Sequence, residues 1–143
     1  MKVTKKVTAC GIIPIFINQK GEKQFLLIKA HHGGINFPKG HMEIGESFLE
    51  TAQRELLEET GLTCKNIDSN NMITEHYTVV RPEKMIEKTV HYFIGYVETQ
   101  NVAIQPAEIK DYFWLDAKKC LEKMNHKESK DVLKKALNIL NKK

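Results

Sequence analysis

The stretch SFLETAQRELLEETG, residues 47–61, carries the clearest helix signal in this 143-residue sequence. Ser47 and Glu50 form the S-x-x-E capping box that begins a helix, and Gly61 supplies the glycine at which a helix ends. The apolar side chains of the segment share one stripe at 3.6 residues per turn: Leu49, Ala52 and Leu56. The pattern predicts a helix over residues 47–60 with one face packed against a core.

Three glutamates crowd the last turns of this expected helix. Glu55, Glu58 and Glu59 fall on one arc beside the apolar stripe, where like charges repel and oppose the helix dipole. A divalent cation would remove the repulsion, because Mg²⁺ prefers hard oxygen ligands such as carboxylates. Arg54 stands four residues before Glu58 and is placed to orient that carboxylate. The alternative is that these glutamates are solvated, as at many acidic helix ends.

The composition is that of an ordinary globular protein. Apolar residues make up 41% and charged residues 28%, and a net charge of +4 does not by itself indicate a nucleic-acid binder. No stretch approaches the roughly 18 apolar residues of a membrane span. Three scattered cysteines without a CxxC pair argue for a reducing compartment and against a cysteine metal site. We expect one domain over residues 1–143, cytoplasmic, with no membrane or stable nucleic-acid partner.

The rest of the chain combines strand and helix patterns around a glycine-rich segment. Residues 31–46 hold four glycines and one proline, which indicates a long ordered loop or a short strand plus loop. Runs of β-branched and aromatic residues predict strands over residues 5–17, 24–30, 71–80, 86–98 and 111–115. Amphipathic patterns predict two further helices over residues 117–124 and 128–140. This order predicts an α/β fold, with a mixed sheet between helices.

The segment GHMEIGESFLETAQRELLEETGL, residues 40–62, resembles the Nudix box. The box is Gly, five residues, Glu, seven residues and Arg-Glu-Leu-x-Glu-Glu-x-Gly-Leu. The chain matches it at Gly40, Glu46, Arg54, Glu55, Leu56, Glu58, Glu59, Gly61 and Leu62. The resemblance implies the Nudix α/β/α sandwich. It also implies Mg²⁺- or Mn²⁺-dependent hydrolysis of a nucleoside diphosphate linked to another group.

A second resemblance narrows the expected substrate. FPKGH, residues 37–41, is similar to the dinucleoside polyphosphate hydrolases of the animal and bacterial asymmetric type. Looser similarity extends over residues 86–98 and 107–115, although Ile35 and Asn36 stand where many relatives carry a tryptophan. The resemblance implies cleavage of diadenosine tetraphosphate to ATP and AMP, with the nucleotide as a small-molecule partner.

The resemblance also implies roles for individual residues. The metal ligands would be the Gly40 carbonyl group and the carboxylates of Glu55, Glu58 and Glu59. Glu108, outside the box, is a further candidate ligand or base. Either Glu58 or Glu55 would be the general base, with Glu58 favoured, and Glu46 would support Arg54.

Two groups of residues are candidates for holding the substrate. The cations available to a polyphosphate are Lys39, His41, Arg81, Lys84 and Lys88. The rings available to stack on an adenine are Tyr77, His91 and Tyr92. Alternation along a strand puts His91 and Tyr92 on opposite faces, so we expect at most one of them to line the pocket.

Other functions stay open from the sequence. A Nudix hydrolase could act instead on RNA 5′ ends or on damaged nucleoside triphosphates. A non-catalytic nucleotide sensor usually lacks glutamates of the box, and this chain keeps all of them. A basic RNA-binding module has little support beyond a pI near 8.9.

Overall fold

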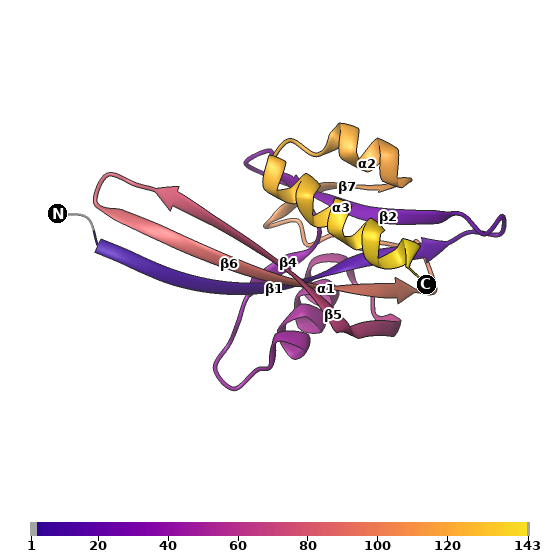
Figure 1. Cartoon of the computed structure of the whole chain (residues 1–143), viewed down its shortest axis with the longest axis horizontal. Helices are drawn as coiled ribbons and strands as arrows, with labels where there is room; N and C mark the ends of the chain where they lie inside the picture. Colours follow the sequence, from indigo (N-terminus) through magenta and orange to yellow (C-terminus); the bar gives the residue numbers. More distant parts are fainter. Residues whose placement is uncertain (1–2, 143) are drawn as a thin grey trace.

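The long first strand lies at the centre of the sheet. In the computed structural model, which describes residues 3–142, β1 (Val3–Ile17) pairs in parallel with β6 (Lys84–Val97) along most of its length. The antiparallel partner of β6 on its other side is β5 (Cys64–Val80). Parallel and antiparallel pairs therefore occur in one sheet, as predicted, and Figure 1 shows the long β5–β6 hairpin beside β1.

On the opposite edge of β1, two strands share its hydrogen-bonding groups. β2 (Lys23–Ala30) pairs with β1 at residues 15–17, whereas β4 (Lys39–His41) pairs with it at residues 9–11. β2 continues away from β1 and pairs with β3 (Ile35–Asn36) and β7 (Ile109–Leu115). Side chains of β2, β3 and β4 all border the large cavity described below.

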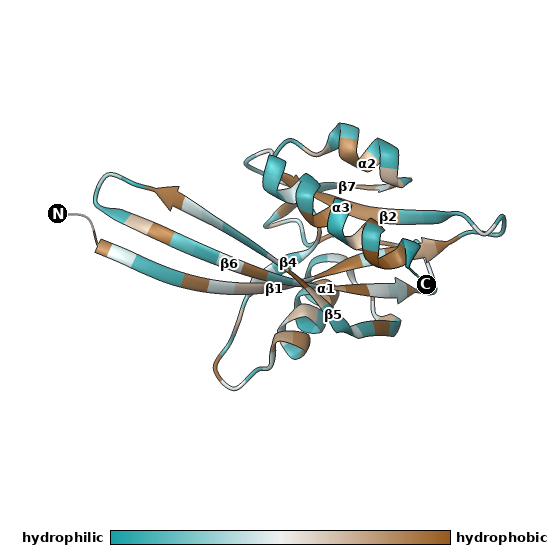
Figure 2. Ribbon diagram, in the orientation of Figure 1, coloured by the Kyte–Doolittle hydropathy of each residue, from teal (hydrophilic) through white to brown (hydrophobic). Residues whose placement is uncertain are grey.

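Helices cover both faces of this sheet (Figure 1). α1 (Phe48–Thr60) packs on one face, where Ala52 and Leu56 join a buried cluster with strand residues. α2 (Ala117–Lys123) and α3 (Lys127–Asn141) belong with a separate cluster that includes Val132 and Leu133. Figure 2 shows apolar stretches in the strands where they pass between the helices. The α/β/α sandwich expected from the sequence is thus confirmed.

The element boundaries differ most from the prediction at β5. This strand begins at Cys64, seven residues before the expected start at Asn71, because residues 64–68 also pair with β6. The register shifts between Asp68 and Ile73, so the polar residues between them break the alternation that marks a strand. The glycine-rich segment holds the two short strands β3 and β4.

No helix within residues 3–142 is long and apolar enough to cross a membrane. Cys10, Cys64 and Cys120 are free thiols, and Cys10 and Cys120 are buried.

Candidate active site

Helix α1 is capped at both ends, and the caps set where it begins and ends. The Ser47 hydroxyl accepts the backbone N–H of Glu50 at 3.1 Å, and the Glu50 carboxylate accepts the N–H of Ser47 at 2.8 Å. Gly61 ends the helix at φ 75°, a left-handed conformation that favours glycine. The capping box and the glycine stop are both as predicted.

Arg54 donates hydrogen bonds to three carboxylates, two on α1 and one just before it. Its Nε donates to Glu46 at 2.6 Å, and its Nη1 donates to Glu55 at 2.9 Å and to Glu58 at 3.1 Å. Its Nη2 donates to the His41 carbonyl oxygen at 2.9 Å, which ties the helix to β4. The hydrogen bond from Arg54 is the main reason that the pKa of Glu46 falls to about 2. Arg54 therefore offsets part of the repulsion among these carboxylates.

Glu59 is held differently from the other two glutamates. Its side chain is buried, with the residue 7% exposed, and it accepts the backbone N–H of Lys39 at 2.9 Å. Burial first, and then the nearby charge of Glu55, raises the pKa of Glu59 to about 8. Burial also raises the pKa of Glu55. Both carboxylates lie where an added positive charge would favour their ionised forms.

Gly40 allows the close approach between β4 and α1. A Cβ atom at Gly40 would collide with the carboxyl group of Glu55, so a side chain at this position would displace that glutamate. The glycine of the box therefore has a steric function that is independent of its expected role as a carbonyl ligand.

A cavity of about 320 Å³ brings the expected metal-site residues together. Its lining residues are Lys39, Gly40, His41, Glu55, Glu58, Glu59, Gln105 and Glu108. Within residues 3–142, no three acidic, His or Cys side chains already form a metal cage. Even so, four carboxylates around one small cavity are the hard oxygen donors that a divalent cation takes, and they fit such an ion chemically.

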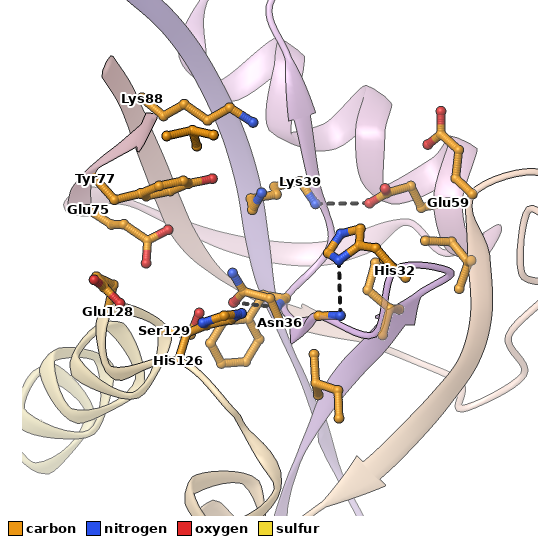
Figure 3. Close-up of a pocket in the computed structure, with 18 of the residues that line it drawn as sticks. His32, Asn36, Lys39, Glu59, Glu75, Tyr77, Lys88, His126, Glu128 and Ser129 are labelled. Atoms are coloured by element: carbon orange, nitrogen blue, oxygen red, sulfur yellow. Dashed lines mark hydrogen bonds between the residues drawn. The ribbon is translucent and has the colours of Figure 1, made fainter. Parts of the chain in front are cut away.

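A larger cavity of about 840 Å³ adjoins the first (Figure 3). Lys39, Glu59 and Glu108 line both cavities, so the two meet at these residues. Among the expected substrate-binding residues, Tyr77 and Lys88 line the large cavity, with the Lys88 Nζ 5.9 Å from the centre of the Tyr77 ring. Arg81 and three residues near the start of α3 also contribute to its polar lining: His126, Glu128 and Ser129.

Three of the candidates for substrate binding, Tyr92, Lys84 and His91, lie elsewhere. Tyr92 is fully buried in the core, so its ring has no face on which an adenine could stack, and this expectation has to be corrected. Its hydroxyl lies 3.2 Å from the amide nitrogen of Asn36 and 3.5 Å from Glu75. Lys84 is exposed at the start of β6 and borders neither cavity.

The alternation expected at residues 91 and 92 is confirmed. His91 lies on the opposite face from Tyr92, with its ring centre 4.2 Å from that of Phe48 on α1. Sequence reasoning did not identify Asn36, Glu75, Gln105 or His126, which line the cavities. Of these, Glu75 carried a signal, since it is a charged residue at an inward position of a strand between Ile73 and Tyr77.

Comparison with known proteins agrees with this geometry. The family model described as "NUDIX domain" matches residues 6–136. The chain is 33% identical to the asymmetrical bis(5′-nucleosyl)-tetraphosphatases of Mus musculus and Sus scrofa, over 92% of its length and 94% of theirs. A solved structure of a C. elegans Ap4A hydrolase in a binary complex shares the fold, with a TM-score of 0.83 and 24% identity over 96% of this chain and 99% of that one. The chain belongs to the Nudix family of hydrolases.

Proposed function

We propose that this protein hydrolyses dinucleoside tetraphosphates asymmetrically and cleaves diadenosine tetraphosphate to ATP and AMP. The names of its 33% identical relatives support this substrate class. The observation that carries the proposal is that the two cavities meet at Lys39, Glu59 and Glu108, which line both of them. A nucleoside in the large cavity would direct its phosphate chain across this boundary, towards the four carboxylates.

Hydrolases of the Nudix family generally need divalent metals. We propose that Mg²⁺ or Mn²⁺ is held by Glu55, Glu58 and Glu59, with the Gly40 carbonyl group and Glu108 as further ligands. When bound, the cation would polarise a phosphoryl oxygen and lower the pKa of an attacking water. The buried Glu59 supports this assignment, because a cation beside it would lower its raised pKa and so favour the ionised carboxylate.

Glu58 is the first candidate for the base that takes a proton from the attacking water. Its side chain is 55% exposed, which leaves it open to solvent, and Arg54 fixes the direction of one of its oxygens. Glu55 is the second candidate, because its raised pKa makes it readier to accept a proton. Its side chain is only 12% exposed, however, so water reaches it less freely.

The cations around the boundary would compensate the charge of the phosphate chain. Of these, Lys39 lines both cavities and Lys88 lines the larger one, whereas His41 lines the smaller one as a neutral hydrogen-bonding group, because burial and the charge of Lys88 lower its pKa. Tyr77 presents its ring beside Lys88 in the large cavity, where a nucleobase could stack (Figure 3). We assign these four residues to substrate binding rather than to proton transfer.

A panel of substrates tests the proposal. Diadenosine tetraphosphate, triphosphorylated RNA and oxidised nucleoside triphosphates would be compared with Mg²⁺ and with Mn²⁺, and the products separated by chromatography. We expect metal-dependent release of ATP and AMP from the first substrate at the highest kcat/KM. Preferential hydrolysis of the RNA or of the oxidised nucleotides would refute the assignment.

Variants connect this activity to the carboxylate cavity. Glu59→Gln should lower kcat/KM about 100-fold, because the amide removes a charged oxygen ligand. Glu98→Gln, an exposed residue that borders neither cavity, is the matched control and should behave as the wild type. Equal activity of the two variants would show that the chemistry takes place elsewhere.

A further inference from the structure

Glu75 interrupts a row of inward-facing side chains on β5. Its neighbours on the same face are Ile73 and Tyr77, and Val90 lies opposite on β6. Ile73 and Val90 belong to the buried core, and Glu75 itself is only 6% exposed. A buried carboxyl group costs free energy unless it is well paired, whereas an aliphatic residue here would extend the core. A broken packing rule of this kind is expected where a residue has a functional role.

One carboxyl oxygen of Glu75 is held and the other is available. The Tyr92 hydroxyl donates to Oε1 at 3.5 Å, and the Asn36 amide donates to that hydroxyl at 3.2 Å. Residues 3–142 provide no hydrogen bond to Oε2. No fully buried side-chain oxygen in this part of the chain lacks a partner, so Oε2 must be accessible. Figure 3 shows the carboxyl group directed into the large cavity beside Tyr77.

The surroundings of Glu75 contain both signs of charge. Lys39 on β4 and His126 before α3 favour its ionised form, and Glu128 on α3 opposes it. Burial has the largest effect and raises the pKa of Glu75. Neither Lys39 nor His126 donates a hydrogen bond to Oε2, so this oxygen can accept one from a donor on a ligand.

The position of Tyr77 indicates which ligand group would meet this oxygen. Residues two apart on a strand share one face and are separated by about 7 Å along it, so the Glu75 carboxyl group lies within reach of a nucleoside stacked on the ring of Tyr77. A base stacked on that ring would bring either its edge or its ribose towards the Glu75 carboxyl group. Both carry donors, namely an exocyclic amino group and the ribose hydroxyls.

We propose that Glu75 is a specificity-determining residue whose Oε2 accepts a hydrogen bond from a donor group of the substrate's nucleoside. The inference rests on the proposed function, because it requires the large cavity to hold a nucleoside. It adds a residue outside the Nudix box, held in place through Tyr92 and Asn36, that selects for a ribose hydroxyl or for an amino-bearing base.

Nucleotide binding measured by calorimetry separates these two donors. ATP, 2′,3′-dideoxy-ATP and ITP would be titrated with Mg²⁺ into the wild type and into Glu75→Ala. The wild type should bind one analogue at least about 10-fold more weakly than ATP, the usual effect of losing a hydrogen bond to a charged group. Weaker binding of the dideoxy analogue identifies the ribose hydroxyls, and weaker binding of ITP identifies the amino group. In Glu75→Ala the difference should vanish.

Two control variants test whether the effect of Glu75→Ala comes from losing the acceptor oxygen. Glu75→Gln keeps an acceptor oxygen and should retain part of the discrimination. Glu87→Ala, at an exposed position on β6, should keep the wild-type ratio. Urea denaturation would verify that each variant is folded.

Two results would overturn the inference. Glu75→Ala could discriminate between ATP and the analogues as strongly as the wild type does, or the wild type could bind all three nucleotides with the same affinity. The readout is binding, so it does not depend on turnover. A wild type that discriminates among the nucleotides but fails to cleave diadenosine tetraphosphate would refute the proposed function and leave the role of Glu75 standing.

Discussion

At the scale of single residues, the buried carboxyl group of Glu59 makes the stability of the metal-free protein depend on pH. Its pKa is about 8 in the folded chain against an ordinary value of 4.5, so between these values the folded state binds more protons than the unfolded state. The stabilising contribution is complete below pH 4.5 and is lost as the pH rises through 8. The slope should approach about 1.4 kcal/mol per pH unit.

Urea denaturation with a chelator, from pH 5 to pH 8, measures this loss. The control is Glu59→Gln, which does not titrate and should show a smaller decrease in the free energy of unfolding over the same range. Parallel curves for the two proteins would mean that Glu59 is not the group responsible.

The contact between Gly40 and Glu55 gives a second prediction at this scale. Gly40→Ala would place a Cβ where the Glu55 carboxyl group lies, so the glutamate must move. Displacing a group of the site by about 1 Å can lower activity by about 100-fold, and we expect a loss in kcat/KM of that order. Steady-state kinetics, with circular dichroism to confirm folding, provides the measurement. Unchanged kinetics would show that the position of Glu55 does not matter for the reaction.

The candidate site was predictable from sequence where residues are close along the chain. Fixed spacing on one helix placed Arg54 and the box glutamates correctly, because helical geometry follows directly from sequence spacing. Tyr92 was misassigned, since alternation gives the face of a strand but not the depth of burial. Glu75 was missed because its neighbours come from β6 and α3, which only the tertiary fold brings to it.

At the scale of elements, α1 is anchored separately at its two ends, and this can be tested. Ser47→Ala removes the hydroxyl that caps the helix and should lower the free energy of unfolding by about 1 kcal/mol. The glutamates lie in the second half of the helix, and Arg54, at its middle, ties it to β4. We therefore expect kcat to stay within about twofold of the wild type.

The matched control is Asp116→Ala, which removes the side-chain cap of α2 away from both cavities. Both variants should lose stability to a similar extent in urea denaturation and keep their activity. A large loss of kcat in Ser47→Ala alone would show that the capping box also positions the catalytic groups.

The elements themselves were predicted best where apolar periodicity is regular. Each helix within residues 3–142 was expected within one or two residues of its observed bounds, namely α1 (Phe48–Thr60), α2 (Ala117–Lys123) and α3 (Lys127–Asn141). The first part of β5 was missed because KNIDSNN is polar and interrupted by a register shift. Its pairing with β6 makes this segment a strand although its own strand propensity is weak.

At the scale of the whole molecule, a bound cation should stabilise the fold. A ligand that binds only the folded state raises the free energy of unfolding, by about 2.7 kcal/mol at 100 times its Kd. The midpoint temperature of thermal unfolding should therefore rise when Mg²⁺ or Mn²⁺ replaces a chelator. Glu59→Gln should show a smaller shift, because it lacks one charged oxygen at the cavity. Equal shifts in both proteins would place the cation at another site.

The sheet order could not be derived from the sequence, although the layered architecture could. Pairing of β1 with β6 joins residues about 80 positions apart, and no local pattern encodes such a contact. The pairing of both β2 and β4 with one edge of β1 is likewise not encoded in a local pattern. Yet this arrangement brings Asn36, Lys39 and Glu75 to one cavity.

The most direct test of the central claim is hydrolysis of diadenosine tetraphosphate in ¹⁸O-labelled water, with the products analysed by mass spectrometry. We expect equal amounts of ATP and AMP, one labelled oxygen carried by only one of the two products, and no reaction when a chelator removes the metal. ADP as the sole product, or undiminished turnover with the chelator, would contradict it.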